Sequence, residues 1–266
     1  MTDKLFKRYN SVMQKVFEEK MDEVATKKEY FAVIKYAREE FEKELIDSLS
    51  TEQTLRSAIE KEGIDYVLDM ALMICDMYLP YSLVSILHET IGAEGIKSRI
   101  LDETRPQADR ASLINALTGH ETDDTISFLI NLIISTDSEL LMEESSYVLS
   151  AFNKDNVYDR IFEYFNQNGI NEDLLSVLVE MFRESDKKDH IYKMLRAYFL
   201  TATDKGLVAN IMADLDDSRA VVFLRGYLSK NIYNIKKSEI TDICSAISRM
   251  GGYVEDFIRY NPKMQS

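Results

Sequence analysis

Apolar residues recur at intervals of three and four along most of the chain, a spacing typical of amphipathic α-helices that turn one face toward a core. The first such stripe runs from residue 3 to residue 25 and contains Leu5, Tyr9, Val12, Val16 and Val24. A second helix is predicted to follow as far as about Leu49, with Thr26 and Glu29 forming a capping box at its start. Two long helices joined by a short turn predict an antiparallel hairpin.

Between residues 50 and 109 the pattern predicts several shorter helices. Gly63 is expected to end the first of them, because glycine readily adopts the backbone conformation that follows a helix. Residues 64–78 are apolar on nearly all sides, which predicts a buried helix. Residues 102–109 (DETRPQAD) are either a linker or the entry to a helix with Pro106 in its first turn.

From residue 110 onward the helical pattern itself repeats as a short helix, a polar turn and a second helix. One apolar position in each second helix recurs at spacings of 33, 33, 29 and 34 residues: Leu129, Phe162, Leu195, Leu224 and Ile258. A position at the end of each first helix recurs at spacings of 35, 30, 33 and 35 residues: Leu117, Phe152, Phe182, Leu215 and Met250. Two columns with a similar period predict about five stacked helix pairs, each needing its neighbours to cover its apolar face.

Two of these repeats, ALTGHETDDTISFLINLI (residues 116–133) and ADLDDSRAVVFLRGYL (residues 213–228), resemble HEAT-like helical repeats. The common features are a first helix ending in Ala-Leu, a Gly/Asp turn, and Ala or Ile with Leu at helical spacing in the second helix. The resemblance covers residues 110–260 and implies an all-α fold, an α-α superhelix in the form of a right-handed solenoid, whose second helices line a concave face. The chain lacks the family's common first-helix proline. Its Asp–Arg pair six residues apart is also missing, since Phe223 follows Asp217 at that distance.

The predicted organisation therefore has two parts. Residues 1–109 form an N-terminal helical hairpin with capping helices, and residues 110–266 form the HEAT-like repeat solenoid, which we expect to continue directly from the first part. If the apolar stripe of residues 5–24 is left uncovered, the hairpin becomes a candidate surface for a homodimer.

The charge balance restricts the partners. The chain has 46 acidic and 32 basic residues, a formal net charge of −14 at pH 7. Such a balance repels nucleic acid and anionic membranes unless a local basic patch overrides it, so we expect neither as a partner. A basic partner is compatible with it.

The cysteines and the N-terminal residues bear on the compartment. Cys75 and Cys244 both stand in apolar stretches, which is typical of buried free thiols in a reducing compartment, although a disulfide between them is the alternative. The first ten residues contain no apolar signal region, and no apolar run is long enough to span a membrane. We therefore expect a cytoplasmic protein.

A short phrase, two apolar residues followed by arginine and then tyrosine, occurs three times: in MLRAYF, FLRGYL and FIRY. It places an arginine directly after the second-helix column in three successive repeats, and a tyrosine one or two residues further on. The residues are Arg196, Tyr198, Arg225, Tyr227, Arg259 and Tyr260. Earlier repeats have Ile130 and Glu163 at the arginine position, so the column is confined to the last three.

This column has two interpretations. Stacked repeats would bring the arginines into a ladder that binds a carboxylate, a phosphate or an acidic peptide, since arginine forks onto anions and tyrosine adds apolar contact. Alternatively, each arginine pairs with an acid such as Asp189, Asp217 or Asp256 and ties adjacent repeats together.

The sequence offers little for catalysis. None of His88, His120 and His190 has a second His or Cys at the spacing of a zinc site, and no phosphate-binding glycine loop is present. We therefore expect no catalytic residues, no metal and no cofactor.

Three functions follow in order of support. The leading hypothesis is a non-enzymatic scaffold that binds a protein or peptide on the concave face of the solenoid. The second is an acidic regulator or immunity-type inhibitor of a basic effector, which rests on the net charge and on acidic turns between the helices of a repeat, such as HETDD (residues 120–124) and DDS (residues 216–218). The third, a nucleic-acid-processing enzyme, is implied by the resemblance alone. HEAT-like enzymes of that kind use a basic groove with Trp, whereas this chain is acidic and has no Trp.

Overall fold

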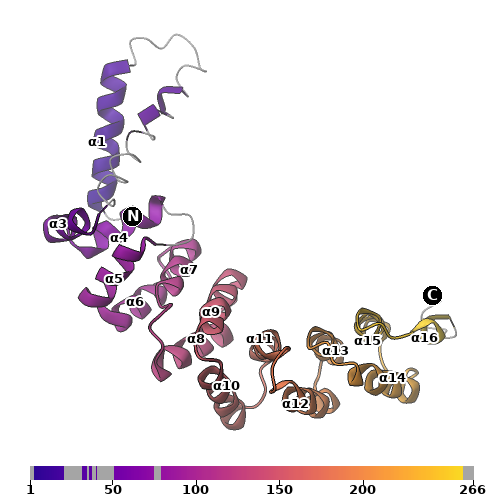
Figure 1. The fold of residues 1–266 in the computed structure, drawn as a ribbon. Helices are drawn as coiled ribbons and strands as arrows, with labels where there is room; N and C mark the ends of the chain where they lie inside the picture. The colour runs from indigo at the N-terminus through magenta and orange to yellow at the C-terminus, as the bar shows by residue number, and fades with distance from the viewer. Residues whose placement is uncertain are drawn as a thin grey trace. The chain divides into compact units, whose positions relative to one another are not determined.

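The protein is all-α in the computed structural model, which describes residues 3–20, 32–34, 36–37, 40, 51–74 and 79–259. Within those ranges every regular element is a helix. Figure 1 shows helices α5 to α16 following one another along the chain and joined by short connections. The all-α prediction is thereby confirmed.

The helices match the predicted pattern closely. Those before residue 116 are α1 (Asp3–Lys20), α3 (Glu52–Glu62), α4 (Ile64–Ile74), α5 (Tyr81–Thr90), α6 (Gly92–Ile100) and α7 (Gln107–Asn115). Those after it are α8 (Asp123–Ser135), α9 (Glu139–Ala151), α10 (Lys154–Asn168), α11 (Glu172–Phe182), α12 (Lys188–Thr201), α13 (Lys205–Asp214), α14 (Arg219–Asn231), α15 (Lys237–Arg249) and α16 (Glu255–Arg259). From α7 onward the helices follow one another in the predicted order, and each predicted turn falls at the junction of two helices.

Polar side chains and glycines set the helix ends. At the starts of α10, α11 and α13, side-chain oxygens of Asn153, Asn171 and Asp204 accept hydrogen bonds from backbone N–H groups that the helix leaves unpaired. Gly63 and Gly169 end α3 and α10 with φ angles of 93° and 88°. These left-handed values favour glycine, and the predicted stop at Gly63 is confirmed.

The helices gather into two compact units. Unit 1 takes the described residues of 1–128 and 136–151, and unit 2 takes those of 129–135 and 152–266, so the division crosses α8. In unit 1, α4 packs against α1 and α3, α5 contacts α3 and α6, and α7 lies against α6 and α9. The sequence-based boundary after residue 109 stays a prediction.

In unit 2 the first helices of successive pairs pack on one another. Helix α13 lies between α11 and α15 and also contacts α12 and α14. The approach to α15 is close at Gly206, where an added Cβ would lie 2.8 Å from the Cβ of Asp242. Glycine is therefore needed there for packing and not for its φ angle.

The two apolar columns are largely buried, as expected. Leu129, Leu195 and Leu224 are fully buried in their second helices. Phe162 and Met250 are only partly buried, and Ile258 departs furthest from the prediction, because it is 36% exposed whereas its neighbour Phe257 is 8% exposed. Helix α16 begins only at Glu255, and its buried side runs through Val254 and Phe257, three residues apart. The anchor of the last repeat was thus predicted one residue too late.

Part of the N-terminal hairpin is visible in the described residues. Val16 of α1 is buried with Val33 and Ala37, and Met13 and Phe17 pack against this cluster. One section of the apolar stripe is therefore covered from within the chain. The predicted cap at residues 26–29 and the rest of the second helix lie outside the described residues.

Candidate functional site

Arg196 lies on the solvent side of α12 and contacts the next second helix. Its guanidinium lies over the ring of Phe223 in α14, 5.3 Å from the ring centre. The side chain is exposed, and no acid among the described residues forms a hydrogen bond or ion pair with it. The predicted pairing with Asp189 or Asp217 is therefore wrong for this arginine.

Arg225, one repeat later, is held by neighbouring groups. Its Nη2 lies 2.7 Å from a carboxylate oxygen of Asp256, and its Nη1 donates to the carbonyl oxygen of Tyr253. Its guanidinium also lies 4.9 Å from the ring centre of Phe257. The Arg225 guanidinium lowers the pKa of Asp256 below its usual value. The second interpretation of the column, an internal ion pair, thus describes Arg225.

The two tyrosines of the described column are bound to first-helix acids. Tyr198 Oη donates to the carboxylate of Glu172 in α11, and Tyr227 Oη lies 3.3 Å from that of Glu239 in α15. Burial, followed by the bond to Glu172, raises the pKa of Tyr198 to about 12. Both hydroxyls are therefore neutral donors that connect a second helix to a first helix.

The last arginine of the column is largely solvent-exposed. Arg259 lies 3.2 Å from Glu255, one turn earlier in α16. Tyr260 lies outside the described residues. Among the predicted residues that the structure describes, Arg196 thus differs from the others in having an exposed guanidinium with no acid beside it.

A second set of contacts, which was not predicted from the sequence, recurs at the starts of the second helices. In each, a basic residue contacts an acid and an aromatic ring of the preceding second helix. Lys187 Nζ lies 3.4 Å from Asp155 and 5.0 Å from the ring centre of Tyr158. One repeat later, Arg219 makes the equivalent contacts with the acid and ring of α12, Asp189 at 2.6 Å and Tyr192 at 4.3 Å. The available signal was the motif Asp-x-x-Tyr, which occurs at both positions.

Arg219 also forms ion pairs with Asp189 and Asp217, the acids that were predicted to pair with the arginines of the first column. It binds Asp217, two residues before it, as well as Asp189 of the preceding repeat. Lys193 and Arg219 lower the pKa of Asp189 to about 2 through their hydrogen bonds to its carboxylate. Asp217 pairs with Arg219 and not with Arg196 because Asp217 and Arg219 stand together at the start of α14, whereas Arg196 lies further along α12.

Several exposed residues of α12 and α14 are apolar or small. Ala197 and Leu200 share the exposed side of α12, with Leu200 59% exposed, and Val222 of α14 is 76% exposed. Gly226, one turn after Val222, is also exposed, and an added Cβ would have no heavy atom within 4 Å. We call these five residues, Arg196, Ala197, Leu200, Val222 and Gly226, the α12–α14 face.

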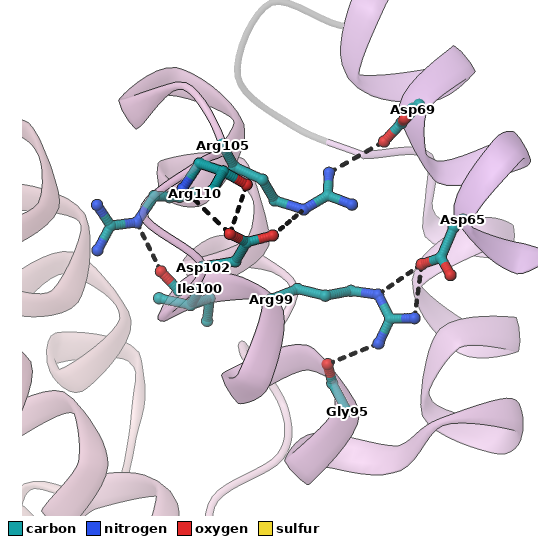
Figure 2. A network of polar contacts seen from close by, with 9 residues as sticks. Asp65, Asp69, Gly95, Arg99, Ile100, Asp102, Arg105 and Arg110 are labelled. Atoms are coloured by element: carbon teal, nitrogen blue, oxygen red, sulfur yellow. Dashed lines mark hydrogen bonds and ion pairs between the residues drawn. The ribbon is translucent and has the colours of Figure 1, made fainter. Parts of the chain in front are cut away.

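Unit 1 contains a separate polar network, drawn in Figure 2. Asp65 and Asp69 stand one turn apart on α4, and each accepts a hydrogen bond from an arginine: Arg99 Nη2 at 2.6 Å from Asp65, and Arg105 Nη1 at 3.0 Å from Asp69. Pro106 is the N-cap residue of α7. Residues 102–109 are therefore a helix entry, held against α4 by the ion pair of Arg105 with Asp69.

The three histidines and Cys244 lie in defined environments. His88 and His120 are stacked on each other in unit 1, and in unit 2 His190 is bonded to Tyr158 and stacked on Phe162. Burial raises the pKa of Cys244 to about 11, while Cys75 lies outside the described residues. No three His, Cys, Asp or Glu residues among the described positions are grouped as metal ligands.

No helix in the described part of the chain is both long and apolar enough to cross a membrane. Comparisons of the chain with protein-family models, with curated proteins and with solved structures found no match.

Proposed function

We propose that this chain is a non-enzymatic scaffold that binds a protein or peptide segment, built as a right-handed solenoid of HEAT-like helix pairs. The packing of α13 between α11 and α15 supports the solenoid, because stacked first helices are the contact that such a repeat requires. The side-chain contacts that recur from one repeat to the next, Arg196–Phe223 with Arg225–Phe257 and Lys187–Asp155 with Arg219–Asp189, support it further.

The α12–α14 face is the proposed binding surface, and the environment of Arg196 is the observation that carries it. An exposed guanidinium with no acid beside it has its N–H donors available for a carboxylate of a partner. Leu200, one turn after Arg196 on α12, and Val222, next to Phe223 on α14, are exposed and offer apolar contact.

Gly226 adds a second reason. Glycine inside a helix costs about 1 kcal/mol relative to alanine. Neither a positive φ angle nor a close neighbour requires it at this position. A surface without side chains at Gly226 lets the backbone of a bound segment approach α14 closely.

The test is a comparison of partners captured from a lysate by the wild-type chain, by Arg196→Glu and by Arg183→Glu. Arg183 is the matched control, since it is an exposed arginine of unit 2 at the end of a first helix. We expect Arg196→Glu to reduce recovery of a specific partner at least tenfold and Arg183→Glu to leave it unchanged. Equal recovery by all three chains would exclude this face as the binding surface.

The acidic-regulator hypothesis is the second candidate, favoured by exposed acids such as Asp124, Asp155 and Asp216 at the turns between paired helices. The same capture experiment distinguishes it when repeated at low and high salt. A basic effector held by these acids would be lost as the salt concentration rises and would not respond to Arg196→Glu.

A further inference from the structure

Arg196 is held in place by a short series of aromatic contacts. Phe199, which is fully buried in α12, meets the ring of Phe223 edge-on, with 5.3 Å between the ring centres. The guanidinium of Arg196 lies over the other side of this contact, on the ring of Phe223. Contact with a ring uses none of the N–H donors of a guanidinium, so they stay available for a planar acceptor such as a carboxylate. Arg196 is therefore positioned for a carboxylate before a partner binds.

The two arginines of α14, in contrast, are already occupied by acids of the chain. Arg219 pairs with two carboxylates and Arg225 with one. Arg196 is thus the one arginine of α12 and α14 that can take a carboxylate from a partner. Further acids in that partner would be repelled by the carboxylates on the chain, whose formal net charge is −14. The face is suited to a segment with a single acidic residue and not to an acidic run.

The exposed apolar surface of the two helices is small. Helices α12 and α14 are described over their whole length, and their exposed large apolar side chains are Leu200 and Val222. An amphipathic helix that docks in a groove presents a stripe of apolar residues over two turns or more. Two side chains, one on each helix, are too few to cover such a stripe. They are enough for one apolar side chain of an extended segment.

The spacing along α12 matches the repeat of an extended chain. Leu200 follows Arg196 by four residues, which is a rise of about 6 Å along the helix. In an extended segment, side chains two positions apart point the same way and are separated by about 6.6–6.8 Å. A carboxylate at Arg196 and an apolar side chain at Leu200 therefore belong to residues two positions apart. Gly226 on α14 leaves open space for a main chain, since an added Cβ would meet no heavy atom within 4 Å.

We infer that the α12–α14 face binds an extended segment of a partner protein in which a single Asp or Glu stands two residues from an apolar residue. The acidic side chain pairs with Arg196, the apolar side chain packs on Leu200, and the main chain approaches Gly226. This chemistry of the partner rests on the proposed scaffold function and specifies which segment the scaffold takes.

Selection from a displayed library of random short peptides tests the pattern. The full chain is immobilised as wild type and as Arg196→Glu, and the peptides enriched on the wild type alone are sequenced. We expect them to share one acidic residue two positions from an apolar residue. Peptides that need Arg196 but carry an acidic run, or the three- and four-residue spacing of a helix, would overturn the inference and leave the scaffold function in place. A library in which nothing binds the wild type better than Arg196→Glu would contradict both.

A titration of the most enriched peptide, followed by fluorescence anisotropy, tests the contacts one by one. Replacing its acidic residue by the corresponding amide should weaken binding to the wild type about tenfold. Replacing the same residue by lysine should restore binding to Arg196→Glu. Gly226→Leu covers the open space with a side chain and should weaken binding severalfold, whereas the control Arg183→Glu should bind like the wild type. An unchanged affinity of the wild type for the amide peptide, or of Gly226→Leu for the original peptide, would overturn the inference.

Discussion

The guanidinium of Arg196 in α12 lies over the ring of Phe223 in α14, 5.3 Å from the ring centre. One repeat later Arg225 lies over Phe257 in the same way, at 4.9 Å. In both cases the ring stands two residues before the next arginine of the column. The recurring phrase thus contains both halves of a contact, since the arginine of one copy meets the aromatic ring of the next.

This contact predicts a coupling between the two residues that a double-mutant cycle can measure. We expect Arg196→Ala and Phe223→Leu to be non-additive in urea unfolding by about 0.5–1 kcal/mol, the range of an exposed cation–π contact. The control cycle pairs Arg196→Ala with Phe257→Leu, which lies one repeat further and should be additive. A coupling within error of zero for Arg196 and Phe223 would mean that the contact contributes no stability.

The second prediction concerns the titration of Asp189, whose pKa is lowered to about 2 by Lys193 and Arg219. The folded value lies below the ordinary value of 3.8. The ion pairs of Asp189 with Lys193 and Arg219 therefore stabilise the fold at pH values above the ordinary pKa. This contribution is lost as the pH falls toward 2 and the carboxylate gains a proton. NMR titration of the side-chain carboxyl should give a midpoint near 2 in the wild type.

In Arg219→Gln the same midpoint should move toward the ordinary value, because one of the two cations is gone. Lys230→Gln, at the far end of α14, is the control and should leave it in place. A midpoint that stays low in Arg219→Gln would show that Lys193 alone holds the carboxylate.

The third prediction uses two glycines of unit 2 in opposite environments. Gly226→Ala should stabilise the chain by about 0.5–1 kcal/mol, because alanine is the better helix former and the added methyl group meets open space. Gly206→Ala should destabilise it, since the new Cβ would lie 2.8 Å from the Cβ of Asp242. Chemical denaturation of both variants and of the wild type gives the change in the free energy of unfolding. A loss of stability in Gly226→Ala would contradict the open space found around position 226.

Much of the helical organisation was predictable because it depends on short-range rules. The spacing of apolar residues, the polar turns and Gly63 act over a few positions, and these led to the succession of helices after residue 106 and to most of the buried positions in their two columns. Ile258 was assigned wrongly because the preceding turn sets where α16 begins, and a shift of one residue rotates a helix by about 100°.

The sequence alone determined that this protein is helical, where its helices lie and which faces are apolar, since these properties arise from neighbours along the chain. Only the tertiary structure decided which charges meet. In that structure Asp189 and Asp217 pair with Arg219, Arg196 has no acid as a partner, and the ring of His88 stacks on that of His120. The physical reason is that such pairs depend on the rotation and distance of helices about thirty residues apart, and periodicity along one helix carries no information about either.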